Sequence, residues 1–177
     1  MSDASKDHTL HGGILYGIEG IEIELQGRLL PGSGKQWNIS ISGLPGPVIR
    51  ETLGRLEAVF AKYGYAPPEG EVLINLAPPD VPKQGTSLDL PIALLALQCA
   101  GIVPDWPAEY ERRFLFIGEL GLHGEIRPVR GVLPIAMVAS NGQSLVVPVG
   151  NQKAVSYTHL RAHETKAKLV CRLLLEK

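Results

Sequence analysis

A run of apolar residues from Leu90 to Ala100 constrains this chain more than any other feature, because it predicts a helix without a polar face. Gln98 is the one polar residue in the run, and a helix of this composition has to be buried on all sides. Asp89 stands at the N-cap or in the first turn, where a carboxylate accepts free backbone N–H groups. Gly101 is well placed to end the helix. The run therefore predicts the central helix of a folded core.

A polar loop from Asp80 to Ser87 leads into this helix. It contains Lys83 and Gly85 and follows two prolines, a composition typical of turns. Backbone N–H groups at a helix N-terminus are available to a negatively charged group. The loop is therefore held at a position suited to binding or catalysis.

Alternation of apolar and polar residues predicts strands within residues 12–30 and over 37–41. The turn at 31–34 favours a hairpin or meander between them. The other expected elements are a helix over 49–63, a strand over 72–76, the buried helix, a strand over 114–117, a hairpin with its tip near 123–124, a helix over 131–140 and a strand over 145–147. Strands followed by alternating helices and strands indicate an α/β fold of the two-layer α+β kind.

The composition is that of one folded domain. The 177 residues are 45% hydrophobic and 20% charged, with a net charge of −1. No apolar run approaches the ~20 residues of a transmembrane helix. Residues 1–11 lack the apolar core of a signal peptide, and we expect them to form a disordered leader. The two cysteines lie far apart and give neither a disulfide framework nor a zinc pattern. We therefore expect a cytoplasmic protein without a membrane contact.

Six short motifs occur in a fixed order along the chain. They are Gly43-Leu-Pro, Asn75-Leu-Ala-Pro-Pro-Asp80, Lys83-Gln-Gly85, Leu88-Asp-Leu-Pro-Ile-Ala-Leu94, Gly118-Glu-Leu and Arg127-Pro-Val-Arg-Gly-Val-Leu-Pro134. In this order they resemble the N-terminal domain of magnesium-chelatase-like AAA+ proteins of the ComM (YifB) group, which are bacterial competence-associated proteins. The resemblance covers residues from about 12 to 151, and we place the domain at 12–154.

The resemblance implies the fold of the Lon protease proteolytic domain, also called ribosomal protein S5 domain 2-like. It implies that the complete protein is a hexameric AAA+ ATPase with branch-migration helicase activity on DNA during natural transformation. The ATPase module, with its ATP and magnesium, is expected to follow this domain and is absent from the chain. The expected partners are that module, neighbouring subunits of the hexamer and, through the full-length protein, DNA.

The last residues depart from this pattern. Residues 1–154 carry 12 Lys and Arg against 16 Asp and Glu, a net charge of −4, whereas residues 155–177 carry 5 against 2, a net charge of +3. Residues 155–177 have no counterpart in the family and resemble a translated sequencing adapter. We therefore expect a non-native tail and exclude it from the interpretation of fold and function.

Ser87 is the candidate nucleophile, with Lys83 four residues before it. The loop resembles the serine loop of the Lon-type fold, in which a lysine deprotonates the serine. That lysine is expected after the glycine of the segment at Gly131, where this chain has Leu133. A serine without a base within hydrogen-bond reach is a poor nucleophile. We therefore expect no catalytic residue in this fragment, and structural or loop roles for Asp80, Gly85, Asp89, Arg127, Arg130 and Gly131.

Residues Gly32 to Lys35 resemble the end of a phosphate-binding loop, but the pattern fails. Leu29 stands where the first glycine belongs, and Gln36 replaces the Ser or Thr that would meet magnesium. A turn between strands is the preferred interpretation, and we expect no cofactor in this fragment.

Three functional hypotheses follow from the sequence. The first is an accessory domain of a ComM-like AAA+ protein, based on the ordered motifs. The second is a Lon-like Ser–Lys hydrolase, which the missing lysine opposes. The third is an S5-like nucleic-acid-binding module in which Lys83, Arg127 and Arg130 form a basic patch. The net charge of −4 over residues 1–154 opposes the third hypothesis.

Overall fold

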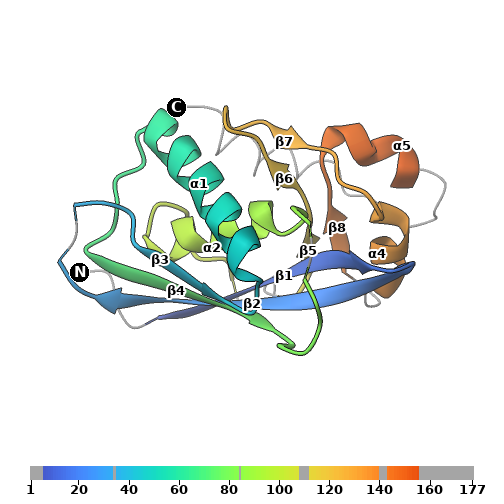
Figure 1. Ribbon diagram of the computed structural model, residues 1–177, viewed down its shortest axis with the longest axis horizontal. Helices are drawn as coiled ribbons and strands as arrows, with labels where there is room; N and C mark the ends of the chain where they lie inside the picture. Colours follow the sequence, from blue (N-terminus) through green and yellow to red (C-terminus); the bar gives the residue numbers. More distant parts are fainter. Residues whose placement is uncertain (1–5, 34, 84, 108–111, 140–142, 156–177) are drawn as a thin grey trace.

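A long antiparallel hairpin forms the middle of the sheet. Its strands are β1 (Asp7–Tyr16) and β2 (Glu19–Pro31), and Ile14 pairs with Ile21 in the register. Gly17 lies in the turn with φ +61°, in the left-handed region that glycine adopts at least cost. The computed structural model describes residues 6–33, 35–83, 85–107, 112–139 and 143–155, and Figure 1 shows how their elements are arranged.

Six strands form one mixed sheet in the order β3-β4-β2-β1-β5-β8. The pairs β3–β4, β1–β5 and β5–β8 are parallel, while β2 runs antiparallel to both of its neighbours. The four further strands are β3 (Ile39–Ser42), β4 (Gly70–Ala77), β5 (Phe114–Phe116) and β8 (Ser144–Val146).

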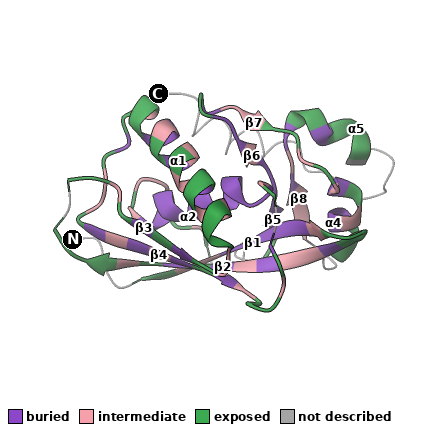
Figure 2. Cartoon of the chain, in the orientation of Figure 1, coloured by how far each residue is buried: buried purple, intermediate pink, exposed green. Residues whose placement is uncertain are grey.

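Two helices, α1 (Gly46–Tyr63) and α2 (Asp89–Cys99), lie on one face of this sheet (Figure 1). Every residue of α2 is buried, as its composition predicts (Figure 2). Gly64 ends α1 in the left-handed conformation, with φ +66°. Burial raises the pKa of the Cys99 thiol to about 12, which suits a core residue. The α/β two-layer prediction is confirmed.

A short helix, α4 (Val132–Val138), packs against the other face of the sheet at one end. Successive residues of β1 point to opposite faces. A Cβ atom on Gly12 would meet the side chains of Leu88 and Pro91 near α2, whereas one on Gly13 would lie 2.3 Å from the Ile135 side chain of α4. The structure therefore has a second, smaller apolar cluster beneath α4, which contains Leu115, Ile117, Val132 and Ile135.

The remaining elements are short. A two-stranded hairpin consists of β6 (Glu119–Leu120) and β7 (Ile126–Arg127), and its turn contains His123, as the sequence predicts. The 3-10 helix η1 (Val149–Asn151) leads into α5 (Gln152–Val155). None of the helices in the described part of the chain has the length and apolar character needed to cross a membrane.

Two predictions about the N-terminal half are wrong. Residues 7–11 belong to β1, so a disordered leader does not extend over them, and His11 is buried with its Nδ1 atom 2.8 Å from Glu22 Oε1. Residues 1–5 lie outside the described residues, as do 156–177 of the expected tail.

The strand after the 31–34 turn does not form a hairpin with β2. It pairs in parallel with β4, because its apolar residues Ile39 and Ile41 enter the core beside that strand.

We predict opposite effects for two Gly-to-Ala substitutions. In Gly20→Ala the new Cβ would lie 2.3 Å from the backbone oxygen of Pro134. The hairpin and α4 would have to separate, at a cost of about 1–3 kcal/mol in the free energy of unfolding. Gly54 is exposed in α1 with open space around it, so Gly54→Ala should stabilise the chain by up to about 1 kcal/mol.

Urea midpoints of the full chain and both variants test this prediction. A Gly20→Ala variant as stable as the parent would contradict the close packing of α4 on the β1–β2 hairpin.

Candidate functional site

The polar loop between β4 and α2 folds around the buried amine of Lys83. This residue is 1% exposed. Its Nζ atom donates hydrogen bonds to the carbonyl oxygens of Pro78 and, at 3.2 Å, Val81. Burial lowers the pKa of the amine, and the nearby Asp80 carboxylate limits that fall. Lys83 thus ties the two ends of one turn together.

Ser87 connects the same loop to the sheet. It is buried, and its Oγ atom donates a hydrogen bond of 2.9 Å to the carbonyl oxygen of Gly13 in β1. Within the described part of the chain, no hydrogen bond joins Ser87 to Lys83. Leu133, which stands where the resemblance requires a lysine, is 43% exposed on α4. The candidate nucleophile is therefore in use as a structural hydrogen-bond donor.

The N-terminus of α2 does not present free N–H groups to a ligand. The backbone N–H of Asp89 donates to Thr86 O at 3.1 Å, and that of Leu90 donates to Gly118 O at 3.0 Å. Pro91 has no N–H to offer. In return, the N–H of Gly118 donates to Ser87 O at 2.9 Å. The segment after β5 therefore occupies the position at which an anion would bind.

The sequence places Asp89 at the N-cap or in the first turn of α2, and the structure shows the first-turn position. The N-cap is Leu88, which makes no side-chain capping bond. The carboxylate of Asp89 is 1% exposed and accepts from Arg55 Nε at 2.7 Å, from Thr52 Oγ1 at 3.0 Å and from the backbone N–H of Leu120 at 3.2 Å. The expected contacts with free N–H groups of the helix are thus replaced by donors on α1 and on the β6–β7 hairpin.

The surroundings of Asp89 have opposing effects on its titration. Burial raises the pKa of the carboxyl group above its ordinary value, while the contacts with Arg55, Leu120 and Thr52 limit the rise. Arg55 also lies 3.9 Å from Glu51, a 70% exposed residue one turn earlier in α1. The Asp89–Arg55 pair therefore joins α2 to α1 at the edge of the core.

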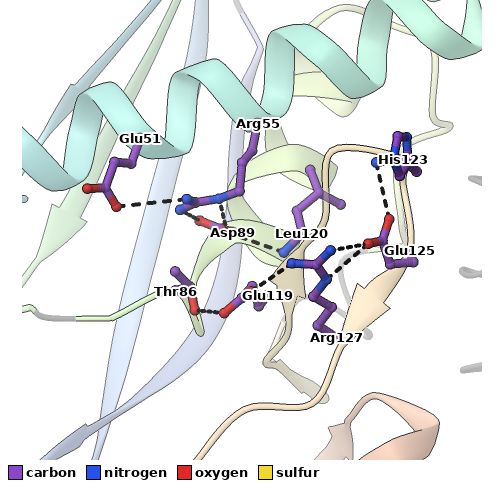
Figure 3. A network of polar contacts seen from close by, with 9 residues as sticks. All are labelled: Glu51, Arg55, Thr86, Asp89, Glu119, Leu120, His123, Glu125 and Arg127. Atoms are coloured by element: carbon purple, nitrogen blue, oxygen red, sulfur yellow. Dashed lines mark hydrogen bonds and ion pairs between the residues drawn. The ribbon is translucent and has the colours of Figure 1, made fainter.

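A second chain of polar contacts attaches the β6–β7 hairpin to the loop. Figure 3 shows Thr86 donating to the Glu119 carboxylate, and Arg127 between Glu119 and Glu125. Glu125 in turn accepts from the backbone N–H of His123 at 3.1 Å. The backbone N–H of Glu125 itself, the contacts with Arg127 and this contact with His123 hold the pKa of the Glu125 carboxyl below its ordinary value. We call Arg55, Thr86, Asp89, Glu119 and Arg127 the hairpin junction.

The tip of the hairpin is fixed by the end of α1. Lys62 Nζ donates to the carbonyl oxygen of His123 at 2.8 Å, and the hydroxyl of Tyr63 donates to the same atom at 3.3 Å. A Cβ atom on Gly124, which has φ +82°, would lie 2.4 Å from the Tyr63 ring. The hairpin is thus held at both ends.

The other residues that the sequence singles out do not come together in one site. Asp80 and Gly85 are exposed in the loop, with Gly85 at φ +88°. Gly131, the N-cap of α4, adopts φ +74°, and a Cβ atom on it would lie 2.8 Å from the Leu15 side chain. Arg130 is exposed. With Lys83 buried and Arg127 paired with two carboxylates, these three cations do not form a basic patch.

Sequence reasoning missed three members of the network: Thr52, Arg55 and Glu119. Thr52 and Arg55 lie on an amphipathic helix whose other charged residues face solvent, and nothing in the periodicity marks Arg55 as different. The sequence did contain one signal of a polar contact there: Thr52 is three residues before Arg55, a spacing that puts both polar side chains on the same helical face. Their partner Asp89 lies 34 residues after Arg55.

Two specific arrangements bear on ligand binding by the described residues: a metal-ion cluster and a phosphate-binding loop. No group of three His, Cys, Asp or Glu suited to a metal ion occurs among them. Gly32 and Lys35 lie between β2 and β3, and the next element in the chain is a strand. A phosphate-binding loop leads into a helix N-terminus, so this segment lacks the element that would receive a phosphate.

Breaking the ion pair should destabilise the chain far more than losing a cap. Asp89→Ala leaves Arg55, the Thr52 hydroxyl and the Leu120 N–H without their acceptor. We expect a loss of about 3–5 kcal/mol in the free energy of unfolding, as for other buried pairs, compared with ~1 kcal/mol for a cap.

Glu51→Ala is the matched control, because it removes the exposed partner of the same arginine. It should cost less than about 0.5 kcal/mol. Urea denaturation of both variants measures the difference. Equal losses, or a loss of ~1 kcal/mol for Asp89→Ala, would contradict the role of the buried pair.

Comparison with known proteins gives relatives of much greater length. The competence protein ComM of Haemophilus influenzae is 30% identical over 118 residues, which cover 66% of this chain and 23% of that protein. The uncharacterized protein YifB of Escherichia coli K12 is 34% identical over 119 residues, with the same coverage of 66% and 23%. An uncharacterized protein of Mycobacterium tuberculosis is 31% identical over 140 residues, covering 76% of this chain and 26% of its own length. The chain thus spans about a quarter of the length of these relatives.

A family model gives the broader assignment. Residues 31–151 match the model described as subunit ChlI of Mg-chelatase. The matched region contains the sheet strands β3, β4, β5 and β8, the helices α1, α2 and α4, and the whole hairpin junction. With this match over more than half of its length, the chain belongs to the Mg-chelatase ChlI family, and it is similar to ComM and YifB.

Proposed function

We propose that this chain is a non-catalytic accessory domain of a ComM-like, Mg-chelatase-related AAA+ ATPase that processes DNA. In this proposal the domain belongs at the N-terminus of the longer protein, and it provides contacts for assembly. The activity of the whole protein is branch migration of DNA during natural transformation, in keeping with the name of the competence protein among the relatives.

One observation carries the proposal: the groups that would perform chemistry are engaged in holding the fold together. Ser87 donates to Gly13 O, and Lys83 donates to the carbonyl oxygens of its own turn. The N–H groups at the start of α2 are used by Thr86 and Gly118. A nucleophile needs a base in reach and a site for the developing negative charge, and this loop supplies neither.

The length of the relatives supports the accessory role. About three-quarters of the length of each relative lies outside the part that this chain matches. The proposal assigns ATP, magnesium and the nucleotide-driven work to an ATPase module in that remaining part. The partners of the domain are then its own ATPase module and neighbouring subunits of a hexamer, and DNA is reached through the full-length protein. The net charge of −4 over residues 1–154 agrees with a protein partner for this domain.

A segment swap tests the accessory role. Residues 6–155 would replace the matched segment of the Haemophilus influenzae competence protein ComM, and transformation frequency would be measured in that organism. We expect the chimera to transform at a frequency closer to the parent than to a strain in which the segment is deleted. A chimera no better than the deletion would contradict the proposal.

Ser87→Ala tests the absence of catalysis. Turnover of a fluorescent casein substrate should stay at the level of the buffer blank for both the parent chain and the variant. The variant should lose about 1 kcal/mol of stability, because a hydrogen bond between α2 and β1 disappears. Peptidase turnover that is present in the parent and lost in Ser87→Ala, with stability unchanged, would identify a hydrolase instead.

A further inference from the structure

Large apolar side chains are exposed together at one end of the molecule. Ile18, in the β1–β2 turn, is 89% exposed, and Met137 on α4 is 76% exposed. Leu133, also on α4, accompanies them at 43%. We call Ile18, Leu133 and Met137 the α4 surface.

The packing of α4 explains why these residues share one end. Val132, Ile135 and Ala136 are the buried side of the helix. Leu133 and Met137, four residues apart, therefore lie together away from that side. The β1–β2 turn is next to them, because Gly20 contacts the backbone of Pro134. Figure 1 shows this end of the hairpin beside α4.

Single exposed apolar residues are normal on a protein surface, but a group of three on adjacent elements indicates a contact site. Methionine is also enriched at the centres of protein interfaces. The three residues carry no formal charge, so they offer no cation to a phosphate backbone. The chemistry of the surface therefore fits an apolar protein partner.

The position of the surface indicates which partner this is. The family match ends at residue 151, in η1. Helix α5, which follows directly, contacts α4, and Val149 at the start of η1 is itself 84% exposed. With this domain at the N-terminus of the longer protein, as the proposed function has it, the next module would leave the domain next to the α4 surface. A short connection gives such a neighbour an effective concentration on the order of millimolar.

We propose that the α4 surface is the docking site for the module that follows this domain in the full-length protein. The inference rests on the proposed function, and it adds the surface and the apolar character of the contact. The hairpin junction then keeps the opposite side of the domain rigid, while the β1–β2 turn and α4 carry the contact.

Hydrogen exchange tests the location of the contact. Backbone amide exchange would be measured on the 177-residue chain alone and on the ComM chimera described above. We expect at least about tenfold slower exchange at residues 16–18 and 132–138 in the chimera, since docking suppresses local opening. The double variant Leu133→Ser/Met137→Ser should lose this protection.

Leu122→Ser is the matched control, because Leu122 is 57% exposed in the turn of the β6–β7 hairpin, away from α4 in Figure 1. It should leave the protection unchanged. Urea midpoints of the isolated variants should stay close to that of the parent, since all three side chains are exposed. A lower midpoint in the double variant would place Leu133 and Met137 in the domain's own core and overturn the inference.

The remaining outcomes separate the two proposals. Protection in the chimera at a different surface would overturn the docking site alone and leave the accessory role in place. No protection anywhere in the domain would overturn both. Analytical ultracentrifugation of the isolated chain adds one more outcome. A dimer that disappears in the double variant would assign the surface to a second copy and overturn the inference.

Discussion

The buried ion pair between Asp89 and Arg55 is the interaction on which the arrangement of this domain depends. Asp89 is the one charged residue of a helix whose other residues, except Gln98, are apolar, and it is 1% exposed. A carboxylate in such a place is costly unless several donors reach it. Those donors come from α1 and from the strand β6. The need to satisfy one charge therefore fixes how two helices and a hairpin lie relative to one another.

The same need closes the loop before α2. Thr86, near the end of the loop, donates a hydrogen bond to the Glu119 carboxylate. Glu119 precedes Leu120, whose backbone N–H donates to Asp89. The backbone N–H of Gly118 donates to Ser87 O, and that of Leu90 donates to Gly118 O. Polar residues that resemble a catalytic loop thus stabilise an inter-element contact. A polar network that is fully satisfied makes a site rigid but leaves little hydrogen-bonding capacity for a substrate.

Apolar surface is distributed very differently at the two ends of the domain. Near the hairpin junction, exposed charges are paired with one another. At the other end, α4 buries one side in its own small cluster and exposes Leu133 and Met137 on the other. A domain of a longer protein has both requirements: a core that holds its shape and a face that a neighbour covers.

The sequence by itself determined the burial of α2, the C-terminal end of α1 and the hairpin near His123, because composition, glycines and periodicity act over a few residues. It also determined the family, through motifs whose order survives without a structure. Only the tertiary structure decided that Asp89 pairs with Arg55, that residues 7–11 extend β1, and that β3 joins β4 and not β2. Each of these depends on a partner distant in the chain: Arg55 is 34 residues before Asp89. Local patterns specify which residues are buried, but the donors and strands that they meet are chosen by packing in three dimensions.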